Sequence, residues 1–151
     1  MYKVVKLALT RTMQEYLKTI YKLKIEQGKK VIRVKEIASD LKVTMPSVTD
    51  AMKKLSKMGL VHYEKYGYID LTKRGERIAK ELYERWKVLK HLLMDILEIT
   101  EETAEKDACM MEHDLSPETA SKIALLTIFI DNCLDEEHKK RLKRFINTGL
   151  C

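Results

Sequence analysis

The stretch of sequence that decides the fold is VKEIASDLKVTMPSVTDAMKKLSKMG, residues 34–59. Apolar residues recur in it at the three- and four-residue spacing of two helical faces, which a short polar break separates. Thr44 is of a type that caps helices, and Pro46 is tolerated in a first helical turn, where its missing N–H has no partner. Glycine commonly follows a helix, as Gly59 does here. The stretch therefore predicts a short helix over residues 34–41, a tight turn, and a second helix from about Pro46 to Met58.

One further helix precedes this stretch, and a hairpin follows it. An apolar helical pattern over residues 13–21 continues until Gly28 ends it. β-prone runs at residues 60–64 and 68–71 are joined through Lys65-Tyr66-Gly67, which predicts a hairpin. Helix, helix, turn, helix and hairpin is the order of a winged helix-turn-helix, in which the third helix enters a DNA major groove.

The expected third helix carries polar and basic residues on its outward side. Small polar groups lie at its N-terminal end, where bases are read, and lysines follow, where phosphates pass. The hairpin tip is a plausible further contact. Winged helices also serve as protein-docking modules, and this alternative remains open. The candidate DNA contacts are Lys35, Thr44, Pro46, Ser47, Thr49, Asp50, Lys53, Lys54, Lys57, Lys65 and Tyr66.

The two halves of the chain carry opposite charge. Residues 1–90 contain 22 Lys and Arg against 10 Asp and Glu, whereas residues 91–151 contain 7 against 13. A basic half favours a polyanion, because the release of counterions from phosphates drives such binding. This asymmetry favours DNA over a protein as the partner of the winged helix, and the acidic half offers carboxylates for cations.

The composition is that of a helix-rich globular protein. The chain has 151 residues, of which 45% are apolar and 34% charged, with five Gly and two Pro. The longest near-apolar run, residues 123–130, is too short to span a bilayer, and the N-terminus lacks a long apolar region and a cleavage site. We expect a cytoplasmic protein without a membrane partner. Further helices are expected to begin after Thr72, Thr100, Ser116 and Asp135.

One motif in the acidic half has the spacing of metal ligands. Cys109, Glu112 and His113 stand at positions i, i+3 and i+4, so a helix projects all three from one face. Soft and hard donors together suit Fe(II), Mn(II), Co(II), Ni(II) or Zn(II), whereas Ca and Mg prefer oxygen alone. The alternatives are ordinary core and helix-end residues, or a hydrolase. Because the chain lacks a pocket-forming α/β pattern and an oxyanion device, we expect no enzyme and no small-molecule substrate.

Three segments of the chain carry a resemblance: EYLKTIY at 15–21, PSVTDAMKKLSKMGL at 46–60 and DACMMEHDLS at 107–116. In this order they resemble the family of the diphtheria toxin repressor and the manganese transport regulator, over roughly residues 12–133. The resemblance implies a homodimer that binds a palindromic DNA operator when Fe(II) or Mn(II) is bound and represses metal-uptake genes. It implies a mainly α fold: a winged helix-turn-helix with a small β-hairpin wing over residues 1–72, then a linking helix and a helical metal-binding and dimerisation domain over residues 73–151.

The same resemblance implies which residues hold the metal. The principal site would use Cys109, Glu112 and His113 together with Glu15, at a position where relatives place Met or Asp. Thr12-x-x-Glu15 is also a capping-box pattern, so an alternative role for Glu15 is to cap its own helix. Co(II), Ni(II) or Zn(II) could replace the native ion in vitro.

The family's second metal position is altered in this chain. The matching residues are Trp86, Lys90 and Glu105, of which only Glu105 is able to ligate. We therefore expect one tightly bound ion per protomer, with Glu105 as a weaker candidate ligand. The alternative function is that of a metal-independent winged-helix regulator, which needs only the first half of the chain.

Overall fold

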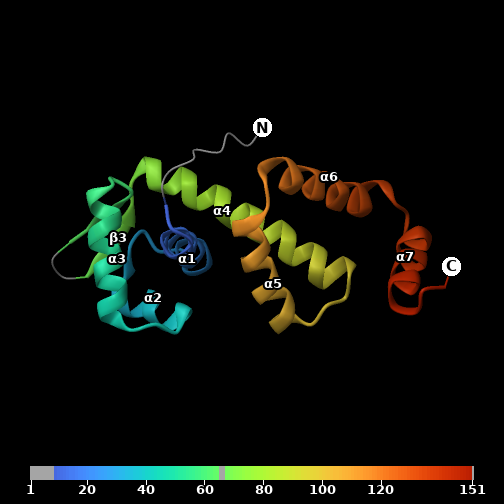
Figure 1. The fold of residues 1–151 in the computed structure, drawn as a ribbon, viewed down its shortest axis with the longest axis horizontal. Helices are drawn as coiled ribbons and strands as arrows, with labels where there is room; N and C mark the ends of the chain where they lie inside the picture. The colour runs from blue at the N-terminus through green and yellow to red at the C-terminus, as the bar shows by residue number, and fades with distance from the viewer. Residues whose placement is uncertain (1–8, 65–66, 151) are drawn as a thin grey trace. The chain divides into compact units, whose positions relative to one another are not determined.

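The computed structural model describes residues 9–64 and 67–150. It divides into two compact units, one ending at Tyr83 and the other containing the chain from Glu84 onward. Both units are mainly helical in their described residues (Figure 1). Among these residues, no helix combines the length and the apolar character that crossing a membrane requires.

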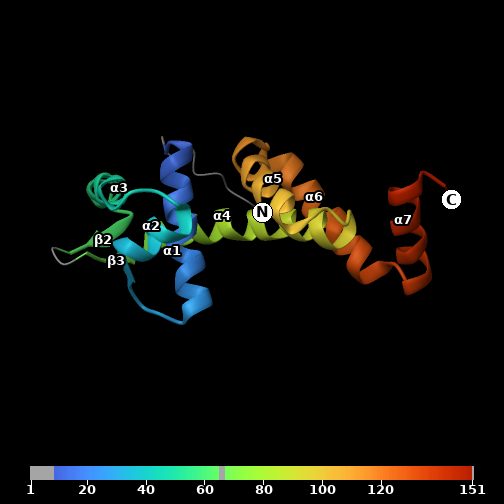
Figure 2. The same ribbon diagram turned by 90° about the horizontal axis from the view of Figure 1, so that it is seen from below.

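Three helices, a small sheet and the beginning of a fourth helix build the N-terminal unit. The strands are antiparallel in the order β1-β3-β2, with Ile32 opposite Ile69 and Val61 opposite Leu71. Helix α1 packs against α2, α3 and β3 (Figures 1 and 2). This arrangement confirms the winged helix-turn-helix, to which β1 adds a strand that we did not expect. The elements are α1 (Arg11–Gln27), β1 (Ile32–Arg33), α2 (Val34–Leu41), α3 (Met45–Lys57), β2 (Val61–Tyr63), β3 (Tyr68–Leu71) and α4 (Lys73–His91).

One apolar core holds the N-terminal unit together. Leu17, Ile20, Ile37, Met52 and Ile69, from three helices and β3, are completely buried. Burial of each such side chain contributes roughly 1.5–3 kcal/mol. The short sheet adds few hydrogen bonds, so packing rather than strand pairing fixes the direction of each helix. One face of α3 is therefore buried in the core, and its opposite face is exposed to solvent.

The described part of the C-terminal unit is helical. The end of α4 continues into a π-helical segment, Leu92–Ile96, which precedes α5 (Glu101–Asp114), α6 (Pro117–Cys133) and α7 (Glu136–Thr148). Ser116 and Asp135 cap α6 and α7 as expected, because their side chains accept backbone N–H groups of the first turn. The buried apolar residues of this unit are Trp86, Leu89, Leu93, Ile96, Ala104 and Ala108.

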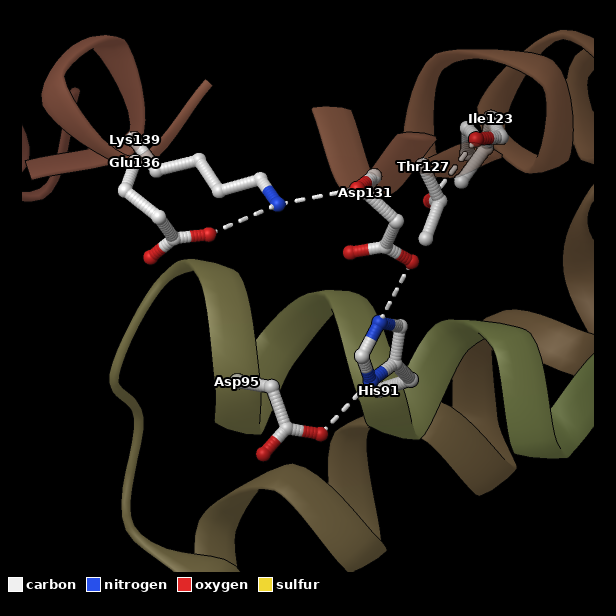
Figure 3. A network of polar contacts seen from close by, with 7 residues as sticks. All are labelled: His91, Asp95, Ile123, Thr127, Asp131, Glu136 and Lys139. Atoms are coloured by element: carbon white, nitrogen blue, oxygen red, sulfur yellow. Dashed lines mark hydrogen bonds and ion pairs between the residues drawn. The ribbon is translucent and has the colours of Figure 1, made fainter. Parts of the chain in front are cut away.

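A polar network joins the π-helical segment to α6 and α7 (Figure 3). The ring nitrogens of His91 lie 2.6 Å from Asp95 Oδ2 and 2.9 Å from Asp131 Oδ2. A carboxylate only accepts hydrogen bonds, so both contacts are satisfied when each ring nitrogen carries a proton. Burial lowers the pKa of His91, but the hydrogen bonds to Asp131 and Asp95 outweigh it and hold the pKa above its ordinary 6.5. Lys139 donates to the backbone carbonyl of Asp131 and to Glu136.

Candidate functional site

The turn between α2 and α3 has the geometry of a helix-turn-helix. Helix α2 ends at Leu41, and the C-cap residue Lys42 has a left-handed φ of 54°. The N–H of Val43 then donates to the carbonyl of Ala38 at 3.0 Å. Thr44 caps α3 by accepting the N–H of Ser47, which confirms its expected role. The two helices are therefore joined by a tight, internally hydrogen-bonded turn.

The residues expected to contact DNA lie mostly on the solvent side of α3. Val48, Met52 and Leu55 are fully buried on its opposite face. Lys35 on α2 and Pro46 are also exposed. Lys65 and Tyr66 lie outside the described residues. On α3, Ser47, Asp50, Lys53, Lys54 and Lys57 are exposed and Thr49 is partly buried.

A second basic surface lies where β1 meets α2. Lys29, Lys30, Arg33 and Lys35 line an open pocket together with Tyr68. The Arg33 guanidinium donates to the Tyr68 hydroxyl at 3.2 Å and lies 5.3 Å from the centre of its ring. Of these residues only Lys35 was expected to contact DNA. The density of cations in the run KKVIRVK, residues 29–35, was the signal that identifies this surface.

Helix α5 carries Cys109, Glu112 and His113 within five consecutive residues near its C-terminal end. The Glu112 side chain is completely buried, and it lines a small cavity with Arg85 of α4 and with alanines of α6. The His113 side chain is almost completely buried, and its Nε2 lies 3.6 Å from Glu112 Oε2. The thiol of Cys109 is partly buried. His113 thus lies beside Glu112 on the same helix, and ligand atoms of Cys109 and His113 lie within 4.8 Å of each other.

This donor set fits a transition-metal ion. Metal–nitrogen and metal–oxygen bonds of about 2.0–2.2 Å place neighbouring donors about 3–3.5 Å apart. The separation of 3.6 Å between His113 Nε2 and Glu112 Oε2 is close to that value. Thiolate and imidazole beside a carboxylate favour a transition metal over Ca or Mg, which prefer oxygen alone.

Glu15 lies on α1, in the N-terminal unit, and its alternative role as a capping residue is wrong. The N-cap of α1 is Thr10, whose hydroxyl accepts a backbone N–H at 3.2 Å. Thr12 is therefore inside the helix, and Glu15 lies beyond the N3 position that a capping box requires. The carboxylate of Glu15 instead lies 2.9 Å from Nζ of the buried Lys18.

Trp86, Lys90 and Glu105 form a cluster between α4 and α5. Lys90 Nζ lies 2.7 Å from Glu105 Oε2, 3.5 Å from Glu101 Oε1 and 5.3 Å from the centre of the Trp86 ring. Burial lowers the pKa of Lys90, but hydrogen bonds and the charges of Glu105 and Glu101 outweigh it and hold the pKa above 10.5. Glu105 is thus already engaged by a cation of the chain itself.

Known proteins match both units. Residues 8–69 match the family model of the iron dependent repressor N-terminal DNA binding domain, and residues 72–141 match that of its metal binding and dimerisation domain. An uncharacterised HTH-type transcriptional regulator of Methanocaldococcus jannaschii is 34% identical over 85% of this chain and 99% of its own length. The HTH-type transcriptional regulator MntR of Bacillus velezensis is 37% identical over 89% of this chain and 91% of its own.

A solved structure agrees with these sequence matches. The manganese regulator SloR aligns with a TM-score of 0.65 and 30% identity, over 78% of this chain and 54% of its own length. This chain therefore spans about half the length of that structure. Because whole-length relatives above 30% identity and both domain models agree, the chain belongs to the iron dependent repressor family of metal-dependent, DNA-binding transcriptional regulators.

Proposed function

We propose that this chain is a repressor that binds a palindromic operator as a homodimer when Fe(II) or Mn(II) is bound, and that it controls metal-uptake genes. The observation that carries the proposal is the donor set of Cys109, Glu112 and His113 on α5, in a chain whose α3 exposes a lysine-rich face. An iron dependent repressor model and a relative described as a manganese regulator favour these two metals. A symmetric dimer reads two half-sites about 34 Å apart, which requires a palindrome.

Four residues hold the metal in this proposal: Cys109, Glu112, His113 and Glu15. When bound, such an ion supplies a positive charge and several coordination positions. Glu15 contributes the ligand from the DNA-binding domain, residues 1–72, and the other three belong to the metal-binding and dimerisation domain, residues 73–151. Glu15 therefore couples metal binding to the position of α3, because it bonds differently with and without the ion. Glu105 is a secondary candidate, since Lys90 already engages it.

An apolar surface on α6 supports the homodimer. Leu125, Leu126, Ile128 and Phe129 each expose more than half of their surface. A cluster of exposed large apolar residues on one helix is typical of an association surface. A second copy of this chain is the occupant that fits, because α6 lies within the part that matches a dimerisation domain.

A DNA-binding titration under anaerobic, reducing conditions tests the proposal. The full chain is added to a labelled DNA selected from a random library, with Mn(II), with Fe(II), with Mg(II) or with a chelator. We expect tight, sequence-selective binding with Mn(II) or Fe(II) alone, and analytical ultracentrifugation should give two chains per operator. If the chelator leaves the affinity unchanged, the chain is a metal-independent winged-helix regulator. Binding to no DNA at all would indicate a protein-docking module.

A further inference from the structure

The beginning of α3 is apolar where it is most exposed. Met45, its first residue, exposes 56% of its surface, and Val43 in the preceding turn exposes 39%. Met45 continues the apolar stripe of α3, but Val48 one turn later is already fully buried. The core therefore ends at Val48. Met45 and Val43, which we call the apolar tip, lie in solvent beyond it.

The hydroxyl groups beside the apolar tip are engaged within the helix itself. Thr44 Oγ1 accepts the backbone N–H of Ser47 at 3.4 Å and lies 2.8 Å from Ser47 Oγ. A hydroxyl engaged in capping has less capacity left for a base edge. The end of α3 that enters a major groove in this fold is therefore less polar than its sequence indicates.

A ligand that fits the apolar tip and the neighbouring part of α3 presents an apolar group beside negative charge. Lys53, Lys54 and Lys57 are exposed along the same helix, and they complement the phosphates of DNA. In the major groove the thymine C5-methyl is the apolar feature that distinguishes base pairs. Methionine suits this contact, because its unbranched side chain adapts to a neighbouring methyl group.

We infer that Met45, together with Val43, reads thymine methyl groups in the operator. The inference rests on the proposed DNA-binding function and names a determinant of sequence specificity within it. Met45 selects thymine at the base pairs that face the start of α3. The lysines farther along the helix supply affinity that is independent of sequence.

Replacement of thymine by deoxyuridine tests the inference, because it removes only the methyl group. An operator is first selected from random double-stranded DNA by the full-length, metal-loaded chain. Each thymine is then replaced singly by deoxyuridine, and the dissociation constant is measured by fluorescence anisotropy. We expect one or two positions per half-site to lose affinity about fourfold, the factor for burial of one methyl group. At the position that Met45 contacts, Met45→Ala should bind the thymine and deoxyuridine operators equally.

Two control variants separate this contact from other effects. Ile25→Ala removes an equally exposed apolar side chain from α1, and it should keep the fourfold discrimination of the parent. Lys53→Ala should weaken both operators by the same factor and keep their ratio, because a phosphate contact carries no sequence information. Far-UV circular dichroism confirms that each variant is folded.

The possible contrary results distinguish a failure of the inference from a failure of the proposed function. If no deoxyuridine position lowers the affinity, or if Met45→Ala keeps the discrimination of the parent, the inference is overturned while the proposed function stands. If Met45→Ala changes the sedimentation of the chain and not its DNA discrimination, the apolar tip contacts protein, and the inference is wrong. A parent chain that enriches no DNA sequence contradicts the proposed function as well.

Discussion

Gly75, in the first turn of α4, lies against the backbone of Leu60. A Cβ at Gly75 would lie 1.8 Å from the Leu60 carbonyl oxygen, which also accepts the N–H of Thr72. Alanine stabilises a helix by about 1 kcal/mol relative to glycine, but this clash with buried backbone outweighs that gain. We expect Gly75→Ala to lower the free energy of unfolding by about 1–3 kcal/mol, measured by chemical denaturation. As a control, Lys80→Ala at an exposed position of the same helix should change the free energy of unfolding by less than about 0.5 kcal/mol. If Gly75→Ala is as stable as the parent chain, the backbone at Leu60 moves to accommodate the Cβ.

We expect Lys90 to limit the number of metal ions that the chain binds. Its ammonium lies between Glu105 and Glu101, and neither a protonated lysine nor the indole of Trp86 donates an electron pair to a metal ion. We therefore expect calorimetry to give one tightly bound Mn(II) per protomer. His113→Ala should abolish that binding. Two tightly bound ions in the parent chain would contradict the prediction.

At the scale of elements, local patterns predicted the helices well and the non-local features poorly. Helix α2 matches its expected range because its periodic residues and the following turn all lie within one segment. β1 is two residues long and exists through its pairing with β3, which no local pattern reveals. The π-helical segment was not predicted either, because the spacing of Leu92, Leu93 and Ile96 fits an α-helix equally well. The wider winding appears in the hydrogen bond from Leu97 N–H to the Leu92 carbonyl.

The bridge between the π-helical segment and α6 should depend on pH. His91 contacts Asp95 and Asp131 through its two nitrogens, and Lys139 and Glu136 of α7 border the same network. The pKa of His91 is raised in the folded chain, so its stabilising contribution is complete below the unfolded value of about 6.5 and is lost as pH rises through the folded pKa. We expect the parent to unfold at a higher temperature than His91→Gln at about pH 6, with a difference that shrinks toward about pH 9.

A second histidine provides the control for this experiment. His138 also contacts an aspartate, Asp135, but more than half of each side chain is exposed. Solvent screens such a pair, so it contributes little to stability. His138→Gln should therefore leave the pH dependence of unfolding close to that of the parent. If the difference between His91→Gln and the parent stays constant over the pH range, the bridge does not depend on the proton.

At the scale of the whole molecule, one part of the candidate site is predictable from the sequence and another part requires the structure. Cys109, Glu112 and His113 were predictable together because they lie within five consecutive positions of one helix. Glu15 is distant in sequence, and only a resemblance to a family associated it with them. Its pairing with Lys18 and the correct N-cap, Thr10, required the structure, since Thr10 and Thr12 are both suitable caps.

The last prediction concerns the coupling between metal and DNA. Cys109, Glu112 and His113 belong to one helix, so an ion held by them alone would leave the DNA-binding domain unaffected. Glu15 is the proposed ligand from that domain, and Glu15→Gln keeps the size of the side chain while it removes the charge. We expect this variant to stay folded and to bind Mn(II) more weakly. It should also lose most of the metal-induced gain in operator affinity, a factor of about 5–150 in typical allosteric systems.

Anisotropy titrations with and without Mn(II) measure this coupling, and two variants isolate its cause. Glu26→Gln makes the same change at an exposed position of α1, so it should respond to Mn(II) as the parent does. His113→Ala should lose the ion itself, whereas Glu15→Gln should reach the fully metal-bound state at higher Mn(II) and still bind DNA weakly. If Glu15→Gln gains as much operator affinity as the parent at saturating Mn(II), the role of Glu15 is limited to its ion pair with Lys18. The coupling would then have to pass through another residue of the DNA-binding domain, because thermodynamic linkage requires that some contact differ between the two states.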